Sequence, residues 1–100
     1  MNVSGKTEPI SLNSRVVATN EQVAATMDGE VVILGFQSGS YYGLDQVGAF
    51  VWDLLQQPKS VAEIRDAILA EYDVAPNECE RDLLALLDDM ATKQLIEVET

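Results

Sequence analysis

Few side chains in this sequence have the chemistry of a catalytic centre. The chain has 100 residues, no histidine and a single cysteine, Cys79. Histidine is the commonest general base and the commonest metal ligand, so the chain lacks the residue that either kind of site usually uses. A nucleophilic thiolate needs a nearby base or cation, whereas the acidic neighbours of Cys79 raise the pKa of its thiol. We therefore expect Cys79 to be a packing or partly exposed thiol.

The adjacent carboxylates Asp88 and Asp89 are the other candidates for chemistry, as ligands of a cation. Neighbouring residues on a helix point about 100° apart, so these two side chains do not converge on one ion. The glycines form no phosphate-binding pattern. The sequence thus predicts no metal site and no cofactor, and we expect no enzymatic activity.

The charge of the chain indicates which partners suit it. Its 17 acidic and 6 basic residues give a formal charge of -11. Nucleic acid and anionic membrane surfaces are disfavoured because both require clustered Lys and Arg. The sequence contains no apolar run near the roughly 18 residues of a membrane span and no secretory signal. With one cysteine and no internal disulfide, we expect a cytoplasmic protein that attracts a basic peptide or protein.

Apolar runs in the N-terminal half predict a three-stranded antiparallel meander. Residues 1–14 are polar and are expected to form a flexible tail, followed by one domain over residues 15–100. Asp28-Gly29 is a favoured hairpin turn because both positions tolerate positive φ. The last strand is left at the edge of the sheet, where unpaired backbone groups can accept another chain. The expected strands cover residues 23–27, 30–36 and 41–44, with a further short strand around residues 15–19.

Helical spacing and capping signals dominate the rest of the chain. Asp45 is a plausible N-cap for a first helix, and Ser60 with Glu63 forms a capping box for a second. Pro76 suits the first turn of a third helix over residues 77–93. A short strand over residues 95–98 would be a wing. We therefore predict an α+β fold of the winged helix-turn-helix type.

A winged helix-turn-helix often binds DNA, but the third predicted helix does not fit that role. A DNA-reading helix is basic or polar, whereas phosphates would repel this one along most of its length. Its acidic residues are Glu78, Glu80, Asp82, Asp88 and Asp89, against Arg81 and Lys93. An acidic winged-helix regulator and a structural subunit of an enzyme remain alternatives.

The edge strand and the third helix together predict a groove. Tyr41 and Tyr42 point to opposite faces of their strand, so one packs inward, and the sequence leaves open which. The third helix carries an apolar stripe broader than one packed side requires. A peptide added as a strand would place its backbone on the edge and alternate side chains in this groove. The stripe consists of Leu83, Leu84, Leu86, Leu87 and Met90.

The order of these features resembles the PqqD-like RiPP recognition elements. These small domains bind the leaders of ribosomally made, post-translationally modified peptides. The resemblance covers residues 15–98, and Asp45 and Gln94 depart from it, since Asn and Gly are usual at those positions. Its marks are the Gly39 turn, the Tyr41-Tyr42 strand ending at Leu44, Gly48 and Trp52 in the first helix, the Ser60 cap, and Asp82 in the third helix.

The resemblance implies a non-catalytic adaptor that presents a precursor peptide to modification enzymes. The leader would lie antiparallel to strand 41–44 and against the third helix, with Glu78 and Asp82 pairing with a Lys or Arg of the leader. The implied peptide-binding residues are the backbone of Ser40, Tyr41, Tyr42 and Gly43, a floor of Tyr41 or Tyr42 with Val32 or Leu34, and a wall of Cys79, Asp82, Leu83, Leu86 and Met90.

The length of the chain and its stand-alone form fit the lasso-peptide systems best within this family. The implied partners there are a leader peptidase and an ATP-dependent cyclase. The alternative is a peptide chaperone for a radical SAM enzyme, as in pyrroloquinoline quinone biosynthesis. The edge strand would also allow a homodimer.

Overall fold

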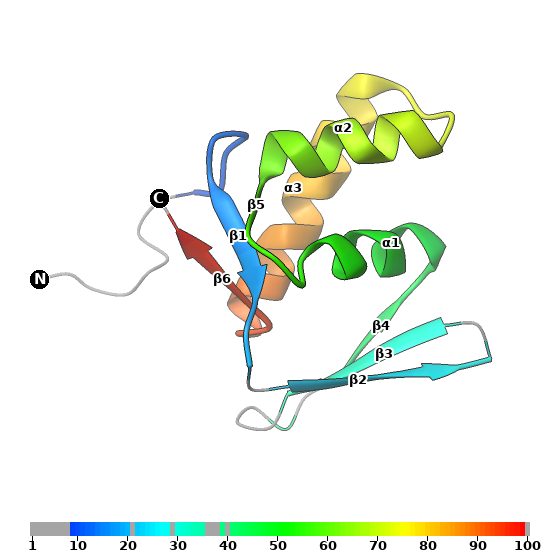
Figure 1. Ribbon diagram of the computed structural model, residues 1–100, viewed down its shortest axis with the longest axis vertical. Coiled ribbons are helices and arrows are strands. Elements are labelled where there is room, and N and C mark those ends of the chain that lie inside the picture. Colours follow the sequence, from blue (N-terminus) through cyan, green and yellow to red (C-terminus); the bar gives the residue numbers. More distant parts are fainter. Residues whose placement is uncertain (1–8, 21, 29, 36–38, 40, 100) are drawn as a thin grey trace, which may run out of the picture.

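The computed structural model describes residues 9–20, 22–28, 30–35, 39 and 41–99, and these residues form an α+β fold (Figure 1). The predicted fold class is confirmed, and the three helices with a C-terminal strand are compatible with a winged-helix arrangement. In chain order the elements are β1 (Arg15–Ala18), β2 (Gln22–Met27), β3 (Glu30–Gly35), β4 (Tyr41–Leu44), α1 (Gln46–Leu54), β5 (Lys59–Ser60), α2 (Val61–Glu71), α3 (Pro76–Thr92) and β6 (Ile96–Glu99).

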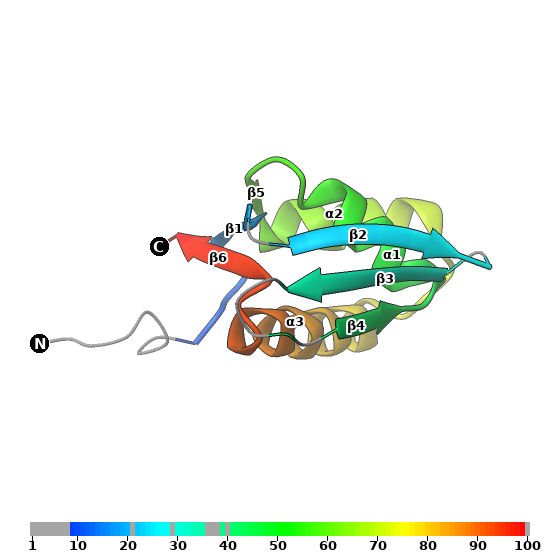
Figure 2. The same cartoon turned by 90° about the horizontal axis from the view of Figure 1, so that it is seen from below.

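The predicted meander is present as an antiparallel sheet in the order β2-β3-β4. Ile33 pairs with Ala24 on one side and with Tyr42 on the other, which fixes the register of all three strands. In the view of Figure 2 this sheet lies in front of α1 and α3, so one of its faces packs on the helices and the other does not. Strand β4 is an edge strand, as predicted.

A second sheet, in the order β5-β1-β6, joins the two ends of the described chain. The sequence indicated a strand near β1 but not its partners, and β6 pairs with β1 rather than with a strand next to it in sequence. Leu12 and Ser14, which the sequence assigned to the flexible tail, are hydrogen-bonded to the start of α2. The carbonyl of Ser14 accepts a hydrogen bond from the Val61 amide at 2.9 Å, and that of Leu12 accepts one from Ala62 at 3.1 Å. Residues 1–8 lie outside the described residues.

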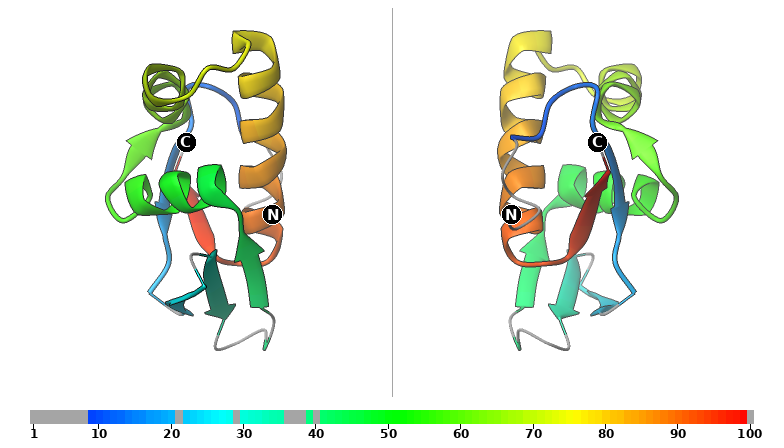
Figure 3. Two further views of the ribbon diagram at one scale, coloured as in Figure 1. Left: turned by 90° about the vertical axis from the view of Figure 1, so that its right-hand side faces the viewer. Right: turned by 90° about the vertical axis from the view of Figure 1, so that its left-hand side faces the viewer.

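The predicted caps start two of the helices. The Asp45 carboxylate accepts a hydrogen bond from the Gly48 amide at 2.8 Å and thereby caps α1. Ser60 and Glu63 form the reciprocal capping box of α2. The three helices bury their apolar faces against each other and against both sheets (Figure 3). Among the described residues, no helix combines the length and the apolar character needed to cross a membrane.

Helix α3 ends in a motif that normally uses glycine. Gln94 has a φ of 63°, in the left-handed region. The Leu95 amide donates to the Met90 carbonyl at 2.9 Å, and the Gln94 amide donates to the Ala91 carbonyl at 3.0 Å. These are the two hydrogen bonds of a Schellman motif, whose left-handed position favours glycine. Helix α3 therefore ends as it would with the glycine that is usual in the family, although the chain has Gln94 at this position.

Candidate functional site

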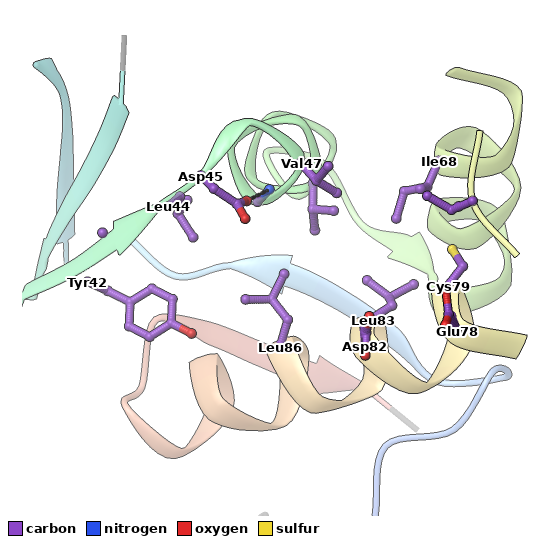
Figure 4. A pocket seen from close by; sticks show the side chains of 14 residues that line it. Tyr42, Leu44, Asp45, Val47, Ile68, Glu78, Cys79, Asp82, Leu83 and Leu86 are labelled. Carbon is purple, nitrogen blue, oxygen red and sulfur yellow. Dashed lines mark hydrogen bonds between the residues drawn. The ribbon is translucent and has the colours of Figure 1, made fainter. Parts of the chain in front are cut away.

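A cavity of about 430 Å³ opens between β4, α1, the C-terminal end of α2 and the first part of α3 (Figure 4). We call it the β4–α3 groove. Its apolar residues come from all four elements, so the sheet edge and the helices together form one hydrophobic recess. The residues that line it are Tyr42, Gly43, Leu44, Asp45, Val47, Gly48, Val51, Ile68, Val74, Glu78, Cys79, Asp82, Leu83 and Leu86.

The structure shows which tyrosine faces the groove. Tyr42 pairs across the sheet with Ile33, which is completely buried, so Tyr42 lies on the inner face of the sheet. Tyr41 lies on the other face and is 71% exposed. Side chains alternate along a strand, so the register alone decides between the two residues.

Seven of the residues predicted to bind a peptide line the groove. They are Tyr42, Gly43, Glu78, Cys79, Asp82, Leu83 and Leu86. On α3 these residues recur at intervals of three and four, which places them on one face of the helix. The groove therefore gathers side chains from β4 and α3, as the sequence led us to expect.

Four predicted residues do not line the groove, and Ser40 lies outside the described residues. Val32 pairs with Gly43 and Leu34 with Tyr41, so they share the outer face of the sheet with Tyr41. Met90 is completely buried and belongs to the core beneath α3. The structure therefore places Val32, Leu34 and Met90 outside the groove and decides the open choice between the two tyrosines in favour of Tyr42, while pairing of the Tyr41 backbone with a leader stays a prediction.

The sequence reasoning missed the contribution of α1 and α2. Val47 and Val51 of α1 line the groove, and apolar spacing along a helix does not reveal which of its residues lie beside such a recess. Ile68 near the end of α2 lies at the end of the groove away from Tyr42 (Figure 4), and Val74 after α2 also lines the groove. A recess shared by several helices depends on their packing, which a single stripe does not specify.

Three acidic side chains line the groove. Asp45 lies at the start of α1, and Glu78 and Asp82 lie one turn apart on α3. The nearest cations balance this charge only weakly. The Arg81–Asp82 pair is 3.6 Å long and exposed, and Arg65 binds Asp66 and Glu80 at 3.0 and 2.9 Å. A peptide with a basic residue would find favourable charge here.

Beyond Leu86, the groove leads to Tyr42 and the last turns of α3. The Lys93 ammonium lies 2.8 Å from an Asp89 carboxylate oxygen and 5.3 Å from the centre of the Tyr42 ring. Burial raises the pKa of Tyr42 to about 12, with a further contribution from the hydrogen bond to Asp89. Hydrogen bonds from Lys93 and then from Tyr42 lower the pKa of Asp89. The Tyr42 hydroxyl is thus held protonated.

Cys79 lies in the groove wall as a largely buried thiol. Burial is the main cause that raises its pKa, and Glu80 and Asp82 raise it further against the opposing effect of Arg65. A raised pKa disfavours the reactive thiolate at neutral pH. Within the described part of the chain, no three His, Cys, Asp or Glu side chains cluster to hold a metal ion.

The model of one protein family, described as coenzyme PQQ synthesis protein D (PqqD), matches residues 30–96. The chain belongs to the PqqD family. The resemblance to PqqD-like RiPP recognition elements is therefore confirmed. The match runs from β3 into β6 and so includes all three helices and every residue of the groove.

Two solved structures are similar to this PqqD-family chain. The first, described as TbiB1 in complex with the TbiA(beta) leader peptide, is 46% identical, with a TM-score of 0.73, and the match covers 81% of this chain and 94% of that one. The second, described as lasso peptide synthetase B1 complexed with the leader peptide, is 26% identical, with a TM-score of 0.72 and coverage of 82% and 96%. No curated protein sequence matches the chain.

Proposed function

We propose that this PqqD-family chain is a non-catalytic adaptor that binds the leader of a ribosomal precursor peptide as a strand added to β4. The observation that supports this most strongly is the position of the β4–α3 groove beside the outer edge of β4. The two similar structures are both complexes with leader peptides. An adaptor that only binds its peptide needs no reactive side chain. The thiol of Cys79 in the groove has a raised pKa, which fits this role.

The geometry supports antiparallel addition of the leader. Strands β2, β3 and β4 are already antiparallel, and sheets of one kind are favoured over mixed ones. Every second side chain of the leader then enters the groove beside Leu44, Val51 and Leu86, while its backbone pairs with β4. A basic residue nearer the leader's N-terminus would lie beside Glu78 and Asp82, because β4 runs towards that end of the groove.

We assign the adaptor to lasso-peptide biosynthesis, with a leader peptidase and an ATP-dependent cyclase as the enzymes that receive the precursor. A similar structure described as a lasso peptide synthetase B1 supports this choice. The description of the matching family favours the alternative, in which a radical SAM enzyme receives the peptide. In either case the adaptor acts in the cytoplasm, where the precursor is made.

The proposal is tested by titrating a fluorescently labelled leader peptide into the protein and two variants. Leu86→Asp places a charge in the apolar wall and should weaken binding about a hundredfold, because a buried unpaired charge costs several kcal/mol. Ala85→Asp is the matched control, since Ala85 is exposed on the same helix and receives the same charge. Equal affinity of wild type, Leu86→Asp and Ala85→Asp would contradict the proposal.

A further inference from the structure

A lysine ammonium lies at the Tyr42 end of the β4–α3 groove. Lys93 Nζ is 5.3 Å from the centre of the Tyr42 ring and 2.8 Å from an Asp89 carboxylate oxygen, and the Lys93 side chain is 37% exposed. Asp89 takes one of the three N–H donors of this ammonium, and the aromatic ring attracts the cation through its face. The ammonium therefore keeps donors for a further carboxylate.

The two ends of the groove differ in charge. In Figure 4, Glu78 and Asp82 lie toward the end that holds Ile68, and Tyr42, which Lys93 contacts, lies at the other end. In the described part of the chain, the other Lys and Arg side chains either bond carboxylates of α2 and α3 or belong to the second sheet. They are Arg65, Arg81, Arg15 and Lys59. An acidic residue of a bound peptide would therefore find its favourable position beside Tyr42.

We propose that Lys93 binds an acidic side chain of the leader, and that this ion pair fixes the register of the leader on β4. This inference rests on the proposed addition of the leader to β4. Strand β4 has four residues, so backbone pairing alone would let the leader slide by two residues and still direct alternate side chains inward. A leader charge that is attracted at one end of the groove and repelled at the other removes this freedom.

Helix α3 gives the spacing of the charges in the leader. Asp82 and Lys93, the C-cap of α3, are about three turns apart and so lie on one face of the helix. Three turns cover about 16 Å, which an extended strand spans in about five residues. Only every second leader side chain points inward, so the basic residue beside Asp82 and the acidic residue beside Lys93 should be about four to six positions apart.

The order of the two charges follows from the directions of the elements. In Figure 4, α3 runs towards Tyr42, whereas β4 runs away from it. A leader antiparallel to β4 therefore runs in the same direction as α3. Its basic residue comes first in sequence, beside Asp82, and its acidic residue comes second, beside Lys93.

Asp89 limits how much affinity the ion pair contributes. This carboxylate accepts hydrogen bonds from Lys93 and from the Tyr42 hydroxyl. A leader carboxylate would share the Lys93 ammonium with Asp89 at a partly exposed position. The expected contribution is therefore about two- to fivefold in affinity, as for exposed ion pairs. An effect of this size selects between registers that are otherwise similar in affinity.

A double-mutant cycle tests the pair. The probes are the labelled leader peptide and versions of it in which each Asp is replaced in turn by Asn and each Glu by Gln. Lys93→Met removes the charge from a side chain of similar length. It should weaken binding of the unmodified leader about two- to fivefold, and it should not weaken binding of the version that lacks the acidic partner.

Lys59→Met is the matched control for Lys93→Met. It makes the same change in charge on β5, in the second sheet and away from the groove. Its effect should therefore be the same for every version of the leader.

Asp89→Asn gives a second, opposite prediction. The asparagine removes the carboxylate that competes for Lys93 and keeps an oxygen that can accept the Tyr42 hydroxyl. It should strengthen binding of the unmodified leader about twofold or more, and it should not strengthen binding of the version that lacks the acidic partner.

The outcomes separate this inference from the proposed function. Failure of the wild type to bind the leader would overturn the proposed function and the inference with it. Leader binding that Lys93→Met leaves unchanged, or weakens equally for every version, would overturn the inference alone. Weaker binding of the unmodified leader to Asp89→Asn would also overturn it, as would an acidic partner that precedes the basic residue in the leader.

Discussion

Strands β2 and β4 are the two edges of one sheet, yet only one of them borders a groove. Four consecutive residues of β2, from Val23 to Thr26, are exposed on both faces of the strand. In β4, by contrast, Tyr42 packs on the core and Leu44 is 4% exposed, whereas Tyr41 and Gly43 are exposed. Unpaired backbone is thus common to both edges. The neighbouring helix is what gives one edge a groove.

Magnitudes show why this difference matters. A backbone hydrogen bond contributes a net ~0.5–1.5 kcal/mol, and either edge offers such bonds equally. Burying one large apolar side chain contributes about 1.5–3 kcal/mol, which corresponds to roughly ten- to a hundredfold in affinity. Only the edge at β4 has Val47, Val51 and Leu86 beside it to receive such a side chain. One or two apolar anchors are therefore enough to direct a peptide to β4 rather than β2.

The largest expected effect comes from disturbing the close contact between α1 and the end of β4. A Cβ at Gly48 would lie 3.0 Å from Leu44 Cδ2, 3.2 Å from Leu44 Cβ and 3.3 Å from Asp45 Oδ1. Gly48→Val should therefore lower the free energy of unfolding by about 1–3 kcal/mol and weaken leader binding, because it displaces the last residue of β4. Urea denaturation measures the first effect and peptide titration the second.

Gln46→Val is the control for Gly48→Val. Gln46 is exposed on the same helix, so its replacement tests the helix propensity of valine without the clash. The expected loss is below about 0.7 kcal/mol. Similar losses in both variants would show that α1 does not depend on close contact with Leu44.

A smaller effect should separate the two tyrosines. Tyr42→Ala removes a side chain that lines the groove and should weaken leader binding about tenfold. Tyr41→Ala removes a side chain of the outer face and should change leader affinity less than twofold in the absence of other proteins. Fluorescence anisotropy with the same labelled leader compares them, and a stronger loss for Tyr41→Ala would reverse the assignment of the faces.

The smallest effect concerns the Tyr42 hydroxyl. Its pKa is raised from 10.0 to about 12, so the folded protein holds this proton more tightly than the unfolded chain does. The resulting stabilisation is fully present below pH 10 and is lost as the pH rises through about 12. In an alkaline absorbance titration of the folded protein, Tyr42 should be the last tyrosine to ionise. The final step in absorbance should therefore be missing from Tyr42→Phe. A last phase that persists in Tyr42→Phe would contradict this assignment.

Local sequence signals predicted much of the fold. Asp45 and the Ser60–Glu63 capping box start helices where expected, because a cap is a contact between residues close in sequence. The pairing of β1 with β5 and β6 was not predicted, since it joins segments far apart in the chain and the sequence carries no local signal for it.

The candidate site was predicted less completely than the fold. The face of α3 that lines the groove followed from helical spacing, which correctly included Leu83 and Leu86. The strand residues depended on register, and the side of β3 that faces inward was chosen wrongly for Val32 and Leu34. Met90 was misplaced because the stripe of α3 is wide enough to reach both the groove and the core.

Amide hydrogen exchange of both edge strands, with and without the leader peptide, distinguishes the two edges as sites of strand addition. We expect alternate amides of β4, between Tyr41 and Leu44, to exchange more slowly when the leader is bound, because they donate to its backbone. Amides of β2 should be unchanged. Leader binding that protects β2, or that leaves β4 unprotected at saturation, would contradict strand addition at the β4 edge.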